Sequence, residues 1–576
     1  MAPLLSRWKK QLDDLRRRKG PEPIRAVARR MVQTAFDAGF VRDVLVGRWA
    51  RLPDLISVAA REGLNVAIVY RLYASTHPER LAIVDSTRSL TYGAAEEEIV
   101  RLMRGLRQEL GVTRKTPVIL MMQNRAEYIL IWIALMRLGA AVVHASWRQT
   151  AEEFAFQLDH SGARIIFAEK AVQEIVDEVL DERPDENVTL LGVDAGSGHK
   201  SYDELLQTRP DEVPKEERPG LPSDGASGGS GNIVYTSGTT GRPKGAVRDF
   251  STFGLVEFFR ILDRLPVEVG DRHLIVSPLY HSGAQAFALM QAALGATLHL
   301  EAHFDAQRTL EALSEHEIHS VFMVPTMIRR VLELPTKIHE ACPTPSLRAI
   351  LSGAAPFPQA LRQRAIERFG THVVHDFYGA TELGWITLIN GQEMLERPRS
   401  VGRPLAGQEL RIMDADGGVL DTGQTGLVYV RNAQTMQGYL RDEKATRATM
   451  RGGWMTVDDL GYLDKDGYLY IVGRARDLVI SAGVNIYPAE VEEIIAQHDA
   501  VSEVAVIGIP DEAWGESLVA VVALRGAVDA GELEAHTREH LSGYKVPRRW
   551  IFVDTLPRNP TGKVLKRVLV EEYGES

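Results

Sequence analysis

The chain has 576 residues, which at about 150 residues per domain corresponds to three or four domain-sized units. Apolar residues make up 45% and charged residues 25%, as in an ordinary globular protein, and no apolar run approaches the roughly 18 residues of a membrane-spanning helix. The net charge of −10 argues against broad binding to nucleic acid, and the single cysteine, Cys342, excludes an internal disulfide framework and a multi-thiolate metal site.

The first 51 residues differ from the rest in charge. They contain thirteen Lys and Arg against five Asp and Glu. The basic residues lie beside Leu4, Leu5, Trp8, Leu12 and Leu15, which suits either an amphipathic helix on an anionic membrane surface or a helix packed on its own protein. We expect an N-terminal extension over residues 1–59 and a cytoplasmic location. Peripheral membrane contact and a homodimer are left open.

Between about residues 230 and 400, short β-branched runs alternate with amphipathic helices. The runs that read as buried strands are Ile233-Val234-Tyr235, Leu274-Ile275-Val276, Val321-Phe322-Met323-Val324, Ile350-Leu351 and Val373-Val374. Residues 358–369 form a predicted helix that Gly370 ends. The alternation indicates an α/β fold of mostly parallel sheets flanked by helices. Polar loops follow these strands, and ligands of such sheets bind outside the carboxyl ends of strands, so the loops indicate one crevice.

The last hundred residues are predicted to form a separate, smaller α+β unit. Pro488 begins a helix, residues 504–509 and 518–524 read as strands, and a second helix covers residues 531–541. Such a unit is compact enough to move as a body. We expect a large domain over residues 60–475 and a small, mobile lid domain over residues 476–576.

The strongest local signal directly follows a predicted strand. It is the run Tyr235-Thr236-Ser237-Gly238-Thr239-Thr240-Gly241-Arg242-Pro243-Lys244-Gly245. Glycines let backbone N–H groups turn toward an anion, hydroxyls add donors, and Lys244 supplies a mobile positive charge. The spacing of a Walker A loop is absent. The run predicts anion binding, and the β and γ phosphates of a nucleotide are the favoured anion.

Further motifs follow this loop in order along the chain. They are Ser277-Pro278-Leu279-Tyr280-His281-Ser282-Gly283, Ser352-Gly353-Ala354-Ala355-Pro356, Tyr378-Gly379-Ala380-Thr381-Glu382, Gly453-Trp454 through Asp459-Leu460-Gly461, Gly473-Arg474-Ala475-Arg476-Asp477 and Asn559-Pro560-Thr561-Gly562-Lys563. From about residue 60 onward, the ordered set resembles the adenylate-forming superfamily of acyl-CoA synthetases, adenylation domains and luciferases. The resemblance implies ATP and Mg²⁺ as ligands and CoA as a co-substrate.

The resemblance also implies a nucleotide site. Tyr378 can stack on adenine, and Asp376 can accept a hydrogen bond from its exocyclic amine. Asp459 can accept from both ribose hydroxyls with Arg474 in support. The family usually has Gly where this chain has Asp458, which leaves open which carboxylate holds the ribose. The full set expected to contact ATP is Thr236, Ser237, Gly238, Thr239, Thr240, Lys244, Gly353, Ala354, Ala355, Asp376, Phe377, Tyr378, Gly379, Thr381, Asp459, Arg474 and Lys563.

Lys563 is the expected catalytic residue of the lid. The acid must attack the α-phosphorus, and a lysine that touches both anions lowers their repulsion where charge develops. By resemblance, Lys244, Glu382 and His281 complete the catalytic set, and Glu382 with Thr236 forms the Mg²⁺ site.

The resemblance implies that the lid rotates between two half-reactions. Arg476 is the expected hinge, where a few dihedral angles absorb a rigid-body rotation. After rotation, Ser481, Ala482 and Gly483 would line the tunnel for the thiol, and Lys545 would help to hold the CoA phosphates.

The acyl pocket is expected around Tyr280, His281, Met323, Leu383 and Trp385. Relatives that activate amino acids carry an Asp near the start of the segment with Tyr280 and His281, which is neutral here. An aliphatic tail gains about 0.8 kcal/mol per buried methylene without a polar partner. We therefore expect a fatty acid:CoA ligase for a medium- to long-chain acid. The alternatives are an aromatic, bile or short-chain acid, an acyl-AMP ligase that loads a carrier protein, and a nucleotide-binding regulatory protein without turnover.

Overall fold

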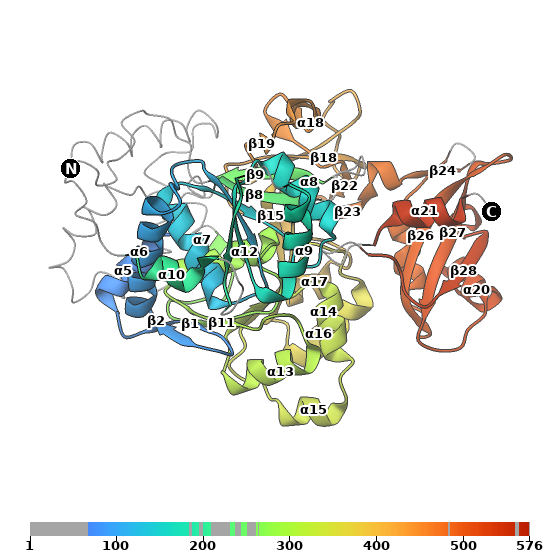
Figure 1. The fold of residues 1–576 in the computed structure, drawn as a ribbon. Coiled ribbons are helices and arrows are strands. Elements are labelled where there is room, and N and C mark those ends of the chain that lie inside the picture. Colours follow the sequence, from blue (N-terminus) through green and yellow to red (C-terminus); the bar gives the residue numbers. More distant parts are fainter. Residues whose placement is uncertain are drawn as a thin grey trace.

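The computed structural model describes residues 67–183, 187–194, 200–208, 231–236, 243–249, 261–262, 264–481, 484–558 and 564–574. The basic segment of residues 1–51 lies outside these ranges. Figure 1 shows a large body and a smaller one that carries the C-terminal elements. Among the described helices, none combines the length and the apolar character that crossing a membrane requires.

An eight-stranded sheet forms one half of the large body. Its order is β19-β9-β8-β4-β3-β5-β6-β7, and the six strands from β8 to β7 run parallel. The strands are β3 (Pro117–Met121), β4 (Ala141–His144), β5 (Ile165–Ala168), β6 (Thr189–Gly192), β7 (Lys200–Ser201), β8 (Gly231–Thr236), β9 (Lys244–Asp249) and β19 (Gly438–Tyr439). Helices α7 (Ala126–Leu138), α8 (Ala151–Ser161) and α9 (Lys170–Asp181) connect parallel strands. Thr150 and Glu153 form a capping box that fixes the start of α8.

A nine-stranded sheet forms the other half, in the order β16-β15-β14-β13-β12-β10-β11-β1-β2. The strands are β1 (Leu81–Val84), β2 (Ser89–Thr91), β10 (Arg272–Ile275), β11 (Thr297–Leu300), β12 (Ser320–Phe322), β13 (Ala349–Ser352), β14 (Val374–Ala380), β15 (Gly384–Asn390) and β16 (Arg403–Pro404). The accompanying helices are α5 (Ile68–Thr76), α6 (Tyr92–Gln108), α10 (Tyr202–Leu206), α12 (Ser282–Ala293), α13 (Ala306–Glu315), α14 (Pro325–Leu332), α15 (Thr336–Ala341), α16 (Gln359–Phe369) and α17 (Gly391–Glu396).

The β-branched runs are the strands β8, β10, β12, β13 and β14, so the predicted α/β class is confirmed. The predicted helix over residues 358–369 is α16, with Pro358 as its N-cap and Gly370 at its end. Two antiparallel pairings were not predicted. β14 continues to Ala380 and pairs with β15, which places Tyr378 on a strand instead of in a turn. β8 continues to Thr236, which pairs with Lys244 of β9.

Helix α12 lies between the two sheets. It has no charged residue and is buried from Ala284 to Ala293, as expected for a helix that is apolar on all sides. The largest hydrophobic cluster joins α12 to α7 and to strands of both sheets. Figure 1 shows α12 at the centre of the large body. The half-buried first turn, Ser282 and Gly283, therefore leads directly into the interior.

An antiparallel sheet completes the large body. Its strands are β17 (Glu409–Met413), β18 (Gly426–Arg431), β20 (Met450–Arg451), β21 (Trp454–Met455), β22 (Asp459–Leu463) and β23 (Leu469–Arg474), with the short helix α18 (Glu443–Ala448). The 3₁₀ turn η3 (Ala475–Asp477) then leads to the small body.

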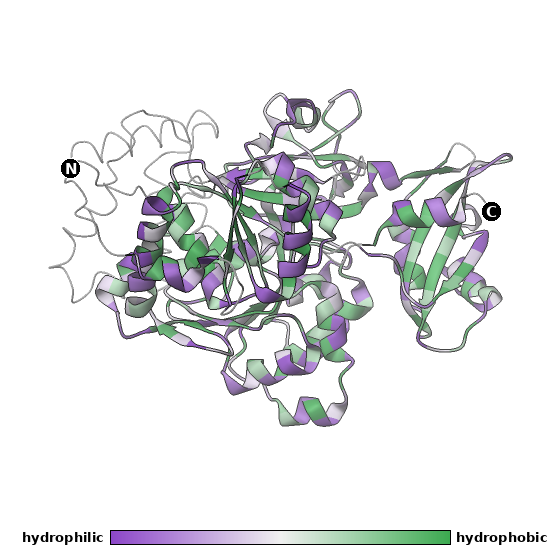
Figure 2. Cartoon of the chain, viewed as in Figure 1, coloured by the Kyte–Doolittle hydropathy of each residue, from purple (hydrophilic) through white to green (hydrophobic). Residues whose placement is uncertain are grey.

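The small body is built on an antiparallel sheet to which one parallel strand is added. Its strands are β24 (Val479–Ser481), β25 (Val484–Ile486), β26 (Val501–Asp511), β27 (Gly515–Leu524) and β28 (Arg549–Val553), and its helices are α19 (Pro488–Ile495), α20 (Ala530–His540), α21 (Lys566–Tyr573) and the 3₁₀ turn η4 (Gly543–Lys545). Figure 2 shows apolar strands and mixed, partly hydrophilic helices in both bodies. This sheet with its covering helices matches the predicted smaller α+β unit.

The two bodies touch through α14 and the start of α16. The Arg329 guanidinium donates to the backbone carbonyl of Ser502, and the Gln359 N–H donates to Glu493 Oε1 at 2.9 Å. Both contacts join groups far apart in the sequence, so they fix one pose of the small body.

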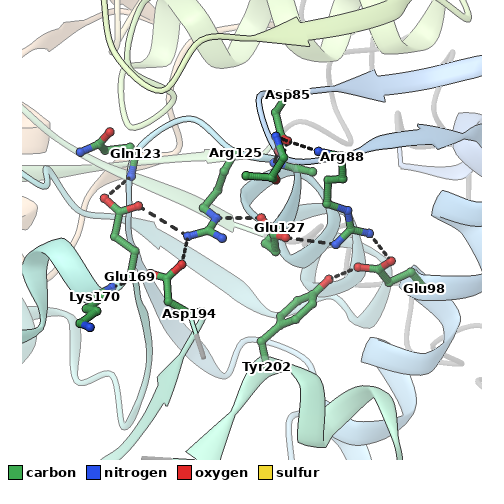
Figure 3. A network of polar contacts seen from close by, with 12 residues as sticks. Asp85, Arg88, Glu98, Gln123, Arg125, Glu127, Glu169, Lys170, Asp194 and Tyr202 are labelled. Atoms are coloured by element: carbon green, nitrogen blue, oxygen red, sulfur yellow. Dashed lines mark hydrogen bonds and ion pairs between the residues drawn. The ribbon is translucent and has the colours of Figure 1, made fainter. Parts of the chain in front are cut away.

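A partly buried ionic network links loops at the strand ends of the two large sheets (Figure 3). Arg125 follows β3 and reaches Glu127 Oε2 at 2.7 Å, Asp194 Oδ1 at 2.8 Å and Glu169 Oε2 at 3.7 Å. Arg88, between β1 and β2, reaches the other oxygen of Glu127 at 3.1 Å. One carboxylate thus links two arginines on different sheets, and the network holds these sheets together.

Candidate functional site

The predicted site residues converge where β8, β14 and β22 meet. Thr236 ends β8, Glu382 follows β14, and Asp459 begins β22. The Thr236 hydroxyl donates to Glu382 Oε1 at 3.2 Å, and the Tyr378 hydroxyl donates to Asp459 Oδ2 at 2.8 Å. Three sheets therefore contribute side chains to one cluster, and we call it the crevice because the polar loops predicted a crevice.

Glu382 accepts two hydrogen bonds from hydroxyl groups on a single oxygen. Its Oε1 accepts from Thr236 and also from the Tyr439 hydroxyl at 3.0 Å. Burial and the Glu382 charge raise the pKa of Tyr439, which keeps this hydroxyl protonated as a donor. The Lys244 ammonium lies 5.2 Å from the centre of the Tyr439 ring. Tyr439 escaped the sequence analysis because β19 reaches the site only by pairing with β9.

These oxygens fit a magnesium ion. Within the described ranges, no group of three His, Cys, Asp or Glu side chains is arranged to hold a metal ion by itself. Mg²⁺ needs no such cage, because it is commonly bound by one or two carboxylates together with substrate phosphates and water. Glu382, with the hydroxyl of Thr236 beside it, supplies that kind of donor set at the end of the predicted phosphate loop.

Asp459 and Asp458 occupy different environments. Asp459 is buried and lies opposite Arg474 in the sheet, where it accepts from Arg474 Nε at 3.0 Å and from Tyr378. Asp458 is exposed and has a left-handed φ of 63°, and its backbone carbonyl accepts from the Ala475 N–H at 2.8 Å. A left-handed residue is most easily glycine, which explains the Gly that the resemblance leads one to expect here. Asp459 is the carboxylate that the crevice surrounds.

Asp376 has a partner that the sequence did not indicate. Arg362 of α16 donates from Nη2 to Asp376 Oδ2 at 2.8 Å and from Nη1 to the Ser400 carbonyl at 2.7 Å. Burial raises the pKa of Asp376 to about 6 even though Arg362 favours the charged form. The contact of Asp376 with adenine stays a prediction.

Gly353, in the turn after β13, has a packing role besides its expected contact with ATP. A Cβ on Gly353 would lie 2.6 Å from the Phe377 ring, so this glycine is needed for the packing of Phe377. Ala354 is exposed and has a left-handed φ of 65°. A Cβ on Gly379 would lie 2.3 Å from the Gly384 carbonyl oxygen, which requires glycine in the tight pairing of β14 with β15. Phe377 itself points to the aromatic interior and away from the crevice around Asp459.

The acyl-pocket predictions are only partly brought together. Tyr280 and His281 lie side by side at the start of α12, with ring centres 4.2 Å apart. Trp385 packs in the central cluster, whereas Met323 is fully buried in a second hydrophobic cluster and Leu383 in a third. Met323 and Leu383 therefore pack in hydrophobic clusters other than the one around Trp385, and their place in the acyl pocket stays a prediction.

Four aromatic rings occupy the interior beside α12. Phe287 stacks on Phe322 and Trp385, with ring centres 5.2 Å and 4.3 Å apart, and meets Phe377 edge-on at 5.6 Å. A Cβ on Gly283 would lie 3.1 Å from the Phe322 ring. The Ser282 and Thr381 hydroxyls lie 2.9 Å apart at the entrance to this region.

Several predicted residues lie outside the described ranges. They are Ser237, Gly238, Thr239 and Thr240 of the phosphate loop, Ala482 and Gly483 of the thiol tunnel, and the catalytic Lys563. In the small body, Ser481 is buried, and Lys545 pairs with both oxygens of Glu490 at 2.7 and 2.8 Å. Lys545 would have to leave Glu490 to reach a phosphate. Arg476 lies in the turn η3 between the two bodies.

Comparison with known proteins identifies the family. Residues 71–440 match the AMP-binding enzyme family and residues 490–563 match the AMP-binding enzyme C-terminal domain. The chain is 30% identical over 505 residues to a 2-succinylbenzoate–CoA ligase of Bacillus subtilis, covering 86% of this chain and 96% of the relative. It is 32% identical over 501 residues to an indoleacetate–CoA ligase of Aromatoleum aromaticum, covering 86% and 95%. It is 30% identical over 516 residues to a long-chain-fatty-acid–CoA ligase of Mycobacterium tuberculosis, covering 88% and 98%.

Solved structures agree with this assignment. The o-succinylbenzoate CoA synthetase of Bacillus subtilis in complex with its acyl-adenylate intermediate aligns with a TM-score of 0.76 and 30% identity over 87% of this chain and 97% of that one. The same enzyme in complex with ATP and a magnesium ion aligns with a TM-score of 0.75 and 29% identity over 87% and 98%. The matches span both bodies, confirm the resemblance read from the motifs, and show that the chain belongs to the AMP-binding enzyme family.

Proposed function

We propose that the chain is an ATP-dependent acid–CoA ligase that forms an acyl-AMP and then an acyl-CoA, with release of AMP and diphosphate. The observation that carries the proposal is the single crevice in which Thr236 and Tyr439 hold Glu382 while Tyr378 and Arg474 hold Asp459. One carboxylate lies at the end of the predicted phosphate loop, and the other has two oxygens suited to the ribose hydroxyls. ATP, Mg²⁺ and CoA are the ligands used by relatives of this kind.

The first half-reaction joins two anions. A carboxylate oxygen of the acid attacks the α-phosphorus, and the bond from this phosphorus to diphosphate breaks. When Mg²⁺ is bound, it neutralises phosphate charge at Glu382. Lys244 lies beside this position and can offset charge on the leaving diphosphate. We assign Lys563 the same task at the attacking acid.

The second half-reaction needs access for a thiol. The CoA sulfur attacks the acyl carbon, and AMP leaves with the bonding electrons. Arg476, in the turn between the bodies, is the proposed hinge, and the loop after Ser481 is the proposed tunnel wall. The small body is held through few polar contacts, including those of Arg329 and Gln359, which suits a part that moves.

For the acid, an aromatic carboxylic acid is the candidate that the interior supports best. Phe287, Phe322, Phe377 and Trp385 offer flat rings next to the Ser282–Thr381 entrance, and aromatic pairs favour stacked and edge-on contacts. The relatives that act on 2-succinylbenzoate and indoleacetate support the same class.

A medium- to long-chain fatty acid is the second candidate. The long-chain-fatty-acid–CoA ligase relative favours it, and burial of methylenes needs no polar partner. It has less support from the interior, because Met323 and Leu383 pack in other clusters.

One assay tests the proposal. AMP release should be measured across aromatic, fatty, bile and short-chain acids, with and without CoA. We expect CoA-dependent AMP release, highest with aromatic acids. If fatty acids gave the highest kcat/KM, they would replace aromatic acids as the first candidate. If no acid gave CoA-dependent release of AMP, the proposed ligase function would be wrong.

A half-reaction assay tests the assignment of Lys563. The Lys563→Ala variant should lose acyl-AMP formation from ATP by about a hundredfold or more but still convert supplied acyl-AMP to acyl-CoA. Equal losses in both half-reactions would contradict the assigned role.

A further inference from the structure

Gln285 is a buried amide whose hydrogen bonds are not made. It is fully buried on α12, one turn after Ser282, and within the described chain neither Nε2 nor Oε1 has a hydrogen-bond partner. A buried polar group without a partner is costly, so such groups are rare and call for an explanation. Gln291 of the same helix is equally buried, but its Nε2 donates to Ser320 Oγ at 2.9 Å, so within the described chain only its Oε1 has no partner.

Gln285 lies beside one end of a buried hydrogen-bonded chain. Burial raises the pKa of Tyr128, and the nearby Gln285 carboxamide partly offsets this rise. The Tyr128 hydroxyl lies 2.7 Å from His144 Nδ1, and His144 Nε2 lies 2.9 Å from Asn232 Oδ1. Trp132 Nε1 donates to the same Asn232 oxygen at 2.7 Å.

The direction of every hydrogen bond in this chain is fixed. An indole N–H can only donate, so the shared atom of Asn232 is an acceptor, and His144 must donate to it from Nε2. Burial lowers the pKa of His144 to about 4, so the ring is neutral and its Nδ1 accepts. The Tyr128 proton is therefore committed to His144. The Tyr128 oxygen can accept one N–H of Gln285, which leaves the second N–H and the Gln285 carbonyl for another partner.

The position of Gln285 on α12 places it on the same helix face as Ser282, next to the proposed site of the acid. Residues three apart on a helix share a face, and three residues rise about 4.5 Å along the axis. At the start of this helix face, the Ser282 hydroxyl contacts Thr381 of the Tyr378–Glu382 motif. Gln285 lies on the same face, one turn farther along the helix. The aromatic rings around Phe287 lie on the neighbouring face of the same helix.

We infer, on the basis of the proposed acid–CoA ligase function, that Gln285 with Tyr128 is a specificity-determining pair that binds a neutral oxygen group of the acid about one helical turn from its carboxylate. A ketone or a hydroxyl matches the free N–H and carbonyl of Gln285. A second carboxylate does not match, because His144 is neutral and an unpaired buried charge is unfavourable. The substrate class is therefore an aromatic keto or hydroxy acid.

The test compares phenylbutanoic acid with its analogue that carries a ketone next to the ring. For the wild type, we expect the keto acid to have a kcat/KM for acyl-AMP formation about 30-fold higher, because a site built for a hydrogen bond rejects an analogue that lacks it. Gln285→Met keeps the side-chain length and removes both polar atoms, and should bring the ratio to within about threefold. The matched control Gln291→Met should keep the wild-type ratio, since its amide already has a protein partner.

A binding measurement separates this inference from the ligase proposal. Non-hydrolysable acyl-sulfamoyl adenosine analogues of both acids should show the same preference by calorimetry, without turnover. A wild-type ratio near one, or a ratio that Gln285→Met leaves unchanged, overturns the role of Gln285. Loss of CoA ligation with the binding preference intact overturns the ligase proposal alone. Tyr128→Phe keeps the ring and should lower the ratio severalfold, which provides a second test if Gln285→Met does not fold.

Discussion

The network around Arg125 and the crevice around Glu382 both gather carboxylates inside the large body, but they balance the charge differently. In the network, Arg125 and Arg88 lie within 3.1 Å of Glu127, and Arg125 lies 2.8 Å from Asp194 (Figure 3). In the crevice, the described residues offer Glu382 no ion pair, and its contacts are the hydroxyls of Thr236 and Tyr439. The first arrangement balances its carboxylates with arginines, whereas the second surrounds Glu382 with neutral hydroxyl donors.

The pKa values of the buried carboxylates also differ between the Arg125 network and the nucleotide region. Burial alone would raise the pKa of Asp194, but the Lys170 N–H and Arg125 lower it below its usual range. Four hydrogen bonds lower the pKa of Asp85 in the same way. Glu169 lies farther from Arg125, at 3.7 Å, and burial raises its pKa. In the nucleotide region, burial raises the pKa of Asp376 to about 6. In the network, close arginine and N–H partners thus hold Asp85 and Asp194 in the charged form, whereas Asp376 is buried so completely that Arg362 does not offset the rise in its pKa.

The largest effect is expected from Glu382→Gln. The amide can still accept from Thr236 and Tyr439, so the thermal midpoint should stay within about 2 °C of the wild type. Adenylation, measured as exchange of diphosphate into ATP, should fall about a thousandfold, because the charge that faces the metal is gone. A variant that retains a tenth of the exchange rate would show that Glu382 is not the metal ligand.

Arg125→Ala should have the opposite pattern. It leaves Glu169 and Asp194 without their arginine and Glu127 with Arg88 alone, and removal of one partner from a largely buried ion pair should lower the free energy of unfolding by about 2–4 kcal/mol. Adenylation by the folded fraction at low temperature should be unchanged. The exposed pair of Arg447 with Glu443 is the control, and Arg447→Ala should cost about 0.5 kcal/mol or less in urea unfolding. Equal losses in the two variants would remove the distinction between the regions.

The sequence predicted the parallel sheets with their helices and most residues of the crevice. The residues that it missed or misplaced can be explained physically. Strands such as β10 and β13 are buried on both faces, so their β-branched runs are visible locally. Tyr439 and Arg362 were missed because each reaches the site from a distant element, through the pairing of β19 with β9 and through α16. Met323 and Leu383 were placed in the pocket because a buried apolar side chain looks the same in any layer. Gln285 and Tyr128 are neighbours in the fold although they lie 157 positions apart, which no local pattern contains.

Asp376 should give a smaller, pH-dependent effect. Its pKa is about 6 in the folded chain and about 4 in the unfolded chain, so the folded state binds more protons between these values. The contribution of Asp376 to stability therefore falls as the pH rises from 4 to 6, by at most about 3 kcal/mol, and is constant above. Asp85 and Asp194 act in the opposite direction below about pH 4, because their pKa values are lowered.

Asp376→Asn removes this titration. Between pH 4 and 6, the urea midpoint of the wild type should fall relative to that of the variant, while the other titrating groups, including the buried histidines whose pKa values are lowered, change both proteins alike. Parallel urea midpoints of the two proteins across pH 4–6 would mean that Asp376 does not titrate there.

The smallest effect is expected at Asp458, and it separates two neighbouring carboxylates. Its left-handed φ of 63° favours glycine, so Asp458→Gly should change stability by no more than about 0.5 kcal/mol, since relief of backbone strain offsets the greater freedom of the unfolded chain. Asp458→Ala should be about 1 kcal/mol less stable than Asp458→Gly, because alanine carries the strain without a compensating contact.

In adenylation, Asp458→Gly should leave the KM for ATP within about twofold, whereas Asp459→Asn should raise it about tenfold through loss of a charge-assisted hydrogen bond to the ribose. A larger rise in KM for Asp458→Gly than for Asp459→Asn would reverse the assignment, since the exposed carboxylate would then bind the nucleotide and the buried one would serve Tyr378 and Arg474 alone.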